Sequence, residues 1–171
     1  MNYVSPSITG FEASGVMGNK EVKSLLDSLP RKHVSNPPLR SIVYKDIVIS
    51  EMPAHRKYPA MNVLGSCVIN ENDSVANITL YRQQENGNLD EYDFRVSIVH
   101  EIGHVVFEYF LNKQKQQEWY SYCVDAGMYW NPAGRDPLEH FCDTYAQFYF
   151  NNLMVKKIFP NEYGFLTEHV F

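Results

Sequence analysis

The sequence predicts a single domain of the α+β class. Its 171 residues suffice for one domain with a substantial core, and a hydrophobic share of 44% is ordinary for a globular protein. Patterns typical of strands fall between residues 41 and 81, whereas helical patterns dominate from residue 94 onwards. Such a separation of strands and helices along the chain is typical of α+β domains.

The first 40 residues predict one helix between two irregular stretches. Residues 1–18 carry Ser, Gly and Pro without periodicity, so we expect an N-terminal arm or an irregular lead-in. From Asn19 to Leu29 the apolar residues fall on one helical face and Pro30 follows, which predicts an amphipathic helix with a defined end. Residues 30–40 contain three prolines and are expected to form a connection.

Three stretches predict strands. Residues 41–49 are rich in β-branched residues around a polar Lys45-Asp46 centre, so they form either one bent strand or a hairpin. Residues 63–69 and 76–81 predict two further strands, joined by the turn-rich sequence N-E-N-D-S.

A long helix is predicted over residues 94–111, F-R-V-S-I-V-H-E-I-G-H-V-V-F-E-Y-F-L. This segment is apolar on most faces, so we expect the helix to be buried, with Asp90 or Asp93 capping its start. Glycine costs about 1 kcal/mol against alanine inside a helix, so Gly103 is expected to permit the close approach of another backbone.

Three more helices are predicted after the long one. Residues 112–124 form the first, with Trp119 and Tyr122 directed inward. The sequence Asp136-Pro137-Leu138-Glu139 starts the second, because Asp is a common N-cap and Pro is favoured at the first helical position. This helix continues to about Leu153, and a last short helix follows Pro160.

Within the long apolar helix, His100-Glu101-Ile102-Gly103-His104 is an H-E-x-x-H sequence. Positions four apart share one face of a helix, so His100 and His104 can bind the same metal ion. Two neutral imidazoles suit zinc, and Glu101 is rotated to a place where it can act as general base on a metal-bound water. The alternative is two core histidines satisfied by backbone carbonyls, which leaves Glu101 and Gly103 unexplained.

A catalytic zinc ion needs a third protein ligand, for which Glu139 is the candidate. Asp143 lies one turn further along the same helical face, where it would hold a ligand histidine by its outer N–H. In the alternative, Glu139 only completes a capping box and Asp143 is solvated. Glu108 and His140 are rival third ligands.

Three segments, H-E-I-G-H, E-H-F-C-D-T-Y-A-Q-F-Y-F and the tail F-P-N-E-Y-G-F-L, are similar to zinc protease domains of the anthrax toxin lethal factor type, which include the Pro-Pro endopeptidases. The resemblance covers mainly the C-terminal half. It implies a zincin-like fold of the gluzincin type, with a small twisted mixed sheet and the H-E-x-x-H helix above a cleft. Residues 19–111 would form this upper part and residues 112–171 a helical lower part.

The same resemblance implies the chemistry of the site. His100, His104 and Glu139 would bind one Zn²⁺ per chain, Glu101 would be the base, and Tyr129 would donate a hydrogen bond to the developing oxyanion. The implied activity is that of a zinc metalloendopeptidase acting on a protein or peptide substrate.

Three alternatives to this activity stay open. The ImmA/IrrE-type metallopeptidases, which cleave an intracellular protein, carry a similar H-E-x-G-H helix and are a second resemblance. A zinc-bound but inactive binding module is another alternative, and the third is a helical interaction protein without metal.

The strand over residues 63–69 is expected at the sheet edge nearest the metal, because residues 76–81 lead more directly into the long helix and should lie inside. An extended peptide can add to such an edge as a further strand. Gly65, Ser66 and Cys67 have little bulk and are candidate substrate-binding residues. The alternative for Gly65 is a β-bulge.

Charge and cysteine content argue against several other classes of protein. A formal charge of −5 and a pI near 5.6 argue against nucleic acid or an anionic membrane as the main partner. No apolar run is long enough to span a membrane, and we expect a monomer. Cys67, Cys123 and Cys142 match no zinc knuckle and are expected to be free thiols, mostly buried. The start of the sequence does not read as a signal peptide, which leaves either a cytoplasmic protein or the mature part of an exported one.

Overall fold

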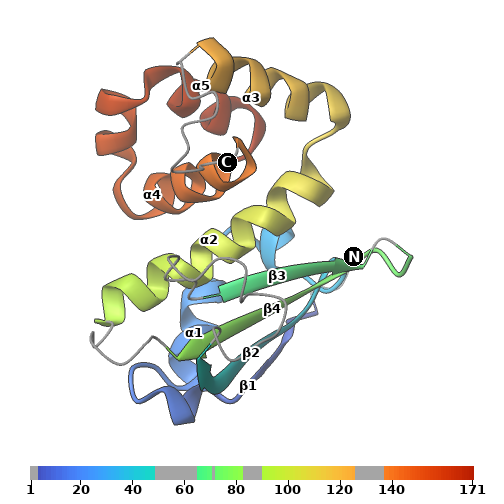
Figure 1. The fold of residues 1–171 in the computed structure, drawn as a ribbon, viewed down its shortest axis with the longest axis vertical. Helices are drawn as coiled ribbons and strands as arrows, with labels where there is room; N and C mark the ends of the chain where they lie inside the picture. The colour runs from blue at the N-terminus through green and yellow to red at the C-terminus, as the bar shows by residue number, and fades with distance from the viewer. Residues whose placement is uncertain (1–3, 49–64, 71, 83–89, 126–136) are drawn as a thin grey trace.

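The computed structural model describes residues 4–48, 65–70, 72–82, 90–125 and 137–171 (Figure 1). Within these residues the chain forms five α-helices and one four-stranded mixed sheet, so the predicted α+β class is confirmed. The strands are β1 (Ser7–Thr9), β2 (Leu39–Val48), β3 (Gly65–Asn70) and β4 (Val75–Arg82). The helices are α1 (Asn19–Asp27), α2 (Glu91–Phe110), α3 (Lys113–Asp125), α4 (Pro137–Ile158) and α5 (Pro160–His169), with 3₁₀ helices η1 (Phe11–Ser14) and η2 (Arg31–Val34).

The sheet has the strand order β1-β2-β4-β3. Strands β1, β2 and β4 run parallel, and β3 pairs antiparallel with β4. Alternate residues of the central strands are buried on one face: Ile42, Tyr44, Ile78 and Leu80. In this strand order β3 lies at an edge and β4 lies inside, so the expected placement of these two strands is confirmed.

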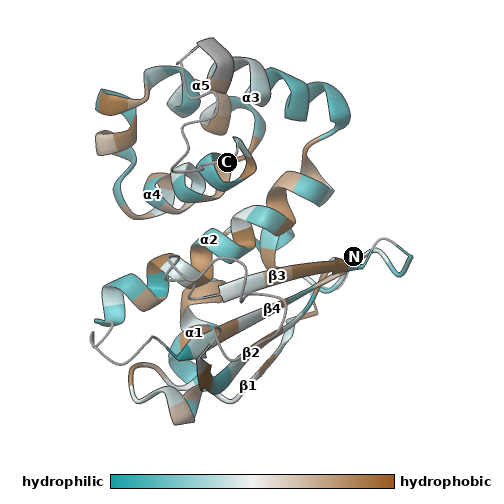
Figure 2. Ribbon diagram, viewed as in Figure 1, coloured by the Kyte–Doolittle hydropathy of each residue, from teal (hydrophilic) through white to brown (hydrophobic). Residues whose placement is uncertain are grey.

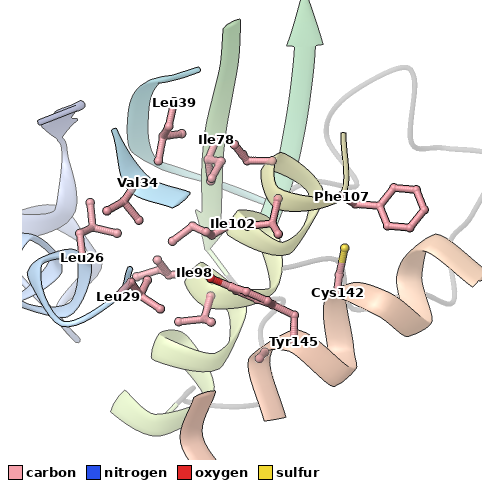
Figure 3. Close-up of a cluster of buried hydrophobic side chains, with 14 of the residues drawn as sticks. Leu26, Leu29, Val34, Leu39, Ile78, Ile98, Ile102, Phe107, Cys142 and Tyr145 are labelled. Carbon is pink, nitrogen blue, oxygen red and sulfur yellow. The ribbon is translucent and has the colours of Figure 1, made fainter. Parts of the chain in front are cut away.

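Helix α2 lies between the sheet and the helical half of the molecule (Figure 1). On the sheet side, Ile98 and Ile102 join the apolar core with Leu26 of α1 and Ile78 of β4 (Figure 3). The start of α2 is capped by Asp90, whose Oδ1 accepts a hydrogen bond from the Asp93 backbone N–H at 2.8 Å. Burial on two sides explains why the sequence of α2 is apolar on most of its faces.

The helical half is organised around Trp119 of α3. Its indole ring is fully buried, with the rings of Phe141 and Phe165 at centroid distances of 5.1 and 5.3 Å. Its Nε1–H donates to the Pro137 carbonyl at 2.8 Å, which satisfies the one polar atom of the ring. The remainder of α3 is largely hydrophilic (Figure 2). The predicted inward orientation of Trp119 is confirmed.

The structure corrects the prediction for the N-terminal stretch. Residues 7–9 form β1, which pairs with β2, so this part of residues 1–18 is not an arm. Phe11 is fully buried, with the rings of Tyr44 and Phe94 each 6.0 Å away. A strand of three residues is too short to show an alternating pattern, and for that reason sequence periodicity misses it.

Two further elements differ in extent from their predictions. Residues 41–48 belong to the single strand β2, with a register irregularity between Lys45 and Val48, which decides against the hairpin. Helix α4 continues to Ile158 beyond a non-helical residue, Asn151 (φ −152°, ψ 69°). No helix in the described part of the chain is long and apolar enough to cross a membrane.

Candidate metal centre

The two histidines of the H-E-x-x-H sequence lie side by side on α2. The imidazole rings of His100 and His104 have centroids 5.3 Å apart, and their side chains are only 18% and 14% exposed. Spacing by four residues places them on one helical face, as predicted. This face is directed at the N-terminal part of α4.

Helix α4 brings one carboxylate to both histidines. The Glu139 side chain lies 3.1 Å from His100 Nε2 through Oε2 and 3.5 Å from His104 Nε2 through Oε1. The hydrogen bond with His100 is the main cause of a lowered pKa of Glu139, with the charges of both histidines adding to it. Glu139 is therefore held as a carboxylate between the two imidazoles.

A second carboxylate holds His100 from the other side of its ring. Asp143, one turn after Glu139, places Oδ1 2.9 Å from His100 Nδ1. Burial by itself lowers the pKa of His100, but the hydrogen bonds to Asp143 and Glu139 and the nearby negative charges outweigh it and raise the pKa to about 10. The ring orientation of His100 is thus fixed so that Nε2 points to Glu139.

The spacing of these atoms can be compared with that of ligands around a metal ion such as zinc. Two ligands about 2.1 Å from a tetrahedral zinc ion lie about 3.4 Å apart. One oxygen of the Glu139 carboxylate lies 3.1 Å from His100 Nε2 and the other lies 3.5 Å from His104 Nε2, both close to this value. Imidazole nitrogens and a carboxylate oxygen are also donor types that zinc accepts.

Glu101 lies beside the histidines in a buried position. Its side chain is 8% exposed, and Oε2 has no hydrogen-bond partner among the described residues, with His104 Nε2 4.0 Å away. Burial raises the pKa of Glu101 to about 7; the His100 charge opposes this shift and Glu139 adds to it. A carboxylate with such a pKa exchanges its proton near neutrality, as a general base must.

Strand β3 packs directly against Glu101. A Cβ atom on Gly65 would lie 2.7 Å from Glu101 Oε1, so the missing side chain makes room for this glutamate. Cys67, two residues on, has its pKa raised to about 12 by burial and by the Glu101 charge. Ser66 instead hydrogen-bonds with Tyr81 at 3.2 Å. The pairing of β3 with β4 is regular from Gly65 to Asn70, so no bulge explains the glycine there.

Gly103 allows α4 to approach α2, as predicted. A Cβ atom on Gly103 would lie 2.8 Å from Cys142 Cα and 3.2 Å from its Sγ. The Cys142 side chain is fully buried and projects from α4 toward α2 (Figure 3). One ligand atom of each of His100, His104 and Cys142 lies within 4.8 Å of the others, so these three residues could hold a metal ion.

The role of Cys142 at this site was missed by sequence reasoning, which predicted only a buried free thiol. The free thiol is confirmed. A signal for its location exists, since Cys142 lies three residues after Glu139 and therefore on nearly the same helical face.

The rival third ligands lie elsewhere. Glu108 is exposed on α2. His140 is buried beside Trp119, with Nε2 3.5 Å from Glu162 Oε1 on α5. Tyr129, the predicted oxyanion donor, and Asp136, the predicted cap of α4, lie outside the described residues.

Comparisons with protein-family models, with curated proteins and with solved structures find no match to this chain. What the chain does must therefore be inferred from the chemistry of these side chains. Two histidines, two carboxylates that contact them, a buried glutamate and a buried thiol are gathered between α2, α4 and β3.

Proposed function

We propose that this chain is a zinc-dependent endopeptidase of the zincin type, which hydrolyses a peptide bond in a protein or peptide substrate. The observation that carries the proposal is the position of Glu139, whose carboxylate faces both His100 and His104 while Asp143 holds the far nitrogen of His100. Two imidazoles and one carboxylate are the ligand set of a catalytic zinc site with one position left for water, and a second carboxylate that orients a ligand histidine commonly accompanies it.

Each residue of the site would have a distinct role in hydrolysis. Bound by His100, His104 and Glu139, zinc would supply a Lewis acid and lower the pKa of a water molecule to about 7. Asp143 keeps the His100 ring in the orientation that directs Nε2 to the site. Glu101 accepts a proton from the attacking water and returns it to the leaving amine.

The environment of Glu101 suits this role. Its carboxylate is buried beside β3, and its pKa of about 7 lets it both accept and release a proton near neutrality. The backbone of Gly65 packs against it and limits its movement. Tyr129 is assigned as the oxyanion donor only through the resemblance to lethal factor-type proteases.

The substrate is proposed to bind along β3. Within the described residues no strand pairs with the outer edge of β3, and an extended peptide would pair there with its backbone N–H and C=O groups. Since Gly65 contacts Glu101, a peptide paired with β3 would pass next to the general base. Val68, 61% exposed on the same strand, would be covered by it.

A single substitution tests the proposal. The zinc-loaded protein is incubated with a mixture of peptides and unfolded proteins, and the products are identified by mass spectrometry. Glu101→Gln should retain zinc, because no ligand is removed, but its rate of hydrolysis should fall at least about 100-fold. Glu108→Gln, an exposed glutamate of the same helix, is the matched control and should cleave at the wild-type rate.

Two outcomes would reject the endopeptidase. Cleavage by Glu101→Gln at the wild-type rate would show that this residue is not the base. A wild-type protein that binds zinc but yields no cleavage abolished by a chelator would be an inactive zinc-bound module.

A further inference from the structure

Cys142 lies in the same cluster as the proposed zinc ligands, although the proposed mechanism does not use it. Its Sγ and one nitrogen each of His100 and His104 lie within 4.8 Å of one another. The thiol is fully buried, and the absent side chain of Gly103 is what allows α4 to hold it so close to α2. The cluster therefore offers two candidates for the third ligand atom, an oxygen of Glu139 and the sulfur of Cys142.

These two donors differ in the metal ions they prefer. Carboxylate oxygen is a hard ligand and thiolate sulfur a soft one; zinc accepts both, whereas softer, thiophilic ions such as Cu⁺ and Cd²⁺ prefer the sulfur. Both residues belong to the first two turns of α4, and they share the same pair of histidines. A switch of donor therefore requires side-chain rotation within one cluster and no rearrangement of helices.

An independent observation also points to a ligand at this place. Glu101 Oε2 is buried beside the cluster and has no hydrogen-bond partner among the described residues. A buried carboxylate oxygen without a hydrogen bond is costly, and His104 Nε2, 4.0 Å away, is too distant to donate one. A bound cation, or a water molecule on that cation, would satisfy it.

We propose that the site has alternative third ligands: Glu139 for zinc, and the Cys142 thiolate for a thiophilic metal ion. When such an ion binds, the S–H bond of Cys142 breaks, its electron pair forms the sulfur–metal bond, and the proton leaves to solvent. No oxidant or reductant is needed. Because His100 and His104 serve both ions, a thiophilic ion competes with zinc. The inference rests on the metal site of the proposed function, and it does not require hydrolysis.

Cadmium titration tests this assignment. Chelator-treated protein is titrated with Cd²⁺ and followed by the ultraviolet charge-transfer absorption that a thiolate–cadmium bond produces. The wild type should show this band, saturating at one ion per chain. Cys142→Ala should lose the band and bind cadmium at least about tenfold more weakly. Cys67→Ala, which removes the other thiol near Glu101, should keep the absorption band and the wild-type affinity for cadmium.

The metal preference gives a second readout. Glu139→Gln should lose more affinity for zinc than for cadmium, whereas Cys142→Ala should lose more affinity for cadmium than for zinc. Cys142→Ser preserves the side-chain shape, so thermal unfolding and circular dichroism of both cysteine variants separate loss of a ligand from loss of the fold.

Three results would overturn the inference: cadmium binding by the wild type without the band, a band that persists in Cys142→Ala, or a band that disappears in Cys67→Ala. Peptide hydrolysis by the zinc-loaded protein is measured separately. A cadmium band without any hydrolysis would support the Cys142 assignment while rejecting the endopeptidase.

Discussion

His33 and His100 are both largely buried, yet their surroundings give them opposite properties. His33, in η2, is fully buried among the rings of Phe110, Tyr145 and Phe171. Burial, aided by the Lys32 charge and partly opposed by a backbone hydrogen bond with Val170, lowers the pKa of His33 to about 4. His100 lies between two carboxylates, and its pKa is raised to about 10 in spite of burial.

The difference shows what distinguishes a core histidine from a candidate metal ligand. His33 has a neutral partner, since its Nδ1 lies 2.9 Å from the Tyr145 hydroxyl. His100 has carboxylates at both ring nitrogens. Burial alone removes the charge of an imidazole, whereas flanking carboxylates stabilise a positive charge at its ring, carried by a proton or, once that proton has left, by a bound metal ion. Carboxylates at both ring nitrogens, and not burial, distinguish His100 as a candidate metal ligand.

The largest expected effect comes from removing the carboxylates that set His100 apart. Glu139→Gln should weaken zinc binding by more than about 100-fold, because it removes a ligand charge. Asp143→Asn should weaken it by about 10- to 100-fold, the scale of an orienting partner outside the ligand set. Isothermal titration calorimetry with a competing chelator measures both affinities.

The pair His140 and Glu162 provides the control for these variants. Glu162→Gln also removes a carboxylate beside a buried histidine, but one that lies between α4 and α5 and away from His100. Its zinc affinity should equal that of the wild type. Unchanged zinc binding in Glu139→Gln would contradict the assigned ligand.

An effect of intermediate size is expected from His33, whose titration should make the stability of the protein depend on pH. Its folded pKa of about 4 lies below the ordinary value of 6.5, so protonation favours the unfolded chain. The contribution to stability is present above pH 6.5 and is lost as the pH falls towards 4. Between pH 7 and pH 5 this one residue should remove about 2 kcal/mol from the free energy of unfolding.

Urea unfolding of the wild type and of His33→Gln at several pH values measures this term. Glutamine does not titrate, so the variant should lose about 2 kcal/mol less between pH 7 and pH 5 than the wild type does. Equal pH dependence of the two proteins would show that His33 is not held in its neutral form. The proposed difference between His33 and His100 would then be wrong.

The smallest effect concerns the helix contact that brings α4 to His100. In an open helix, Gly→Ala stabilises by up to about 1 kcal/mol, which is the expectation for Gly164→Ala on α5, where a Cβ atom meets nothing within 4 Å. In Gly103→Ala, the new Cβ atom would meet Cys142 Cα at 2.8 Å. Overpacking should then destabilise the protein by about 1 kcal/mol or more.

Thermal unfolding of both glycine variants decides the sign of each change. Gly103→Ala should also weaken zinc binding, because it forces α4 and its Glu139 and Asp143 away from His100. Stabilisation in both variants would mean that the contact between α2 and α4 is looser than the structure shows.

Helix α2 and the two histidines were predictable because their signals are local. The apolar pattern, the cap at Asp90 and the spacing of His100 and His104 all lie within about 20 residues, where helical geometry fixes which side chains share a face. The same reasoning placed Glu139 and Asp143 one turn apart on α4. That Asp143 would hold one of the two histidines was a prediction across helices, and in the structure both Asp143 and Glu139 contact His100.

The contacts that were missed join residues distant in the chain. Gly65 packs against Glu101, and the backbone whose close approach Gly103 was expected to permit is that of Cys142. Nothing in the local sequence of Gly65 reveals that a glutamate 36 positions later occupies the place of its side chain. The three-residue strand β1 was missed because its stabilising partner, β2, lies more than 30 residues away.

The central claim is that His100 and His104 bind a catalytic metal ion, and metal analysis of the purified protein tests it most directly. Protein equilibrated with zinc and passed through a desalting column should retain one zinc ion per chain by inductively coupled plasma mass spectrometry. The double variant His100→Ala and His104→Ala should retain none, while His33→Gln should retain the wild-type amount. A wild-type protein that retains no zinc, or a double variant that retains as much as the wild type, would contradict the claim.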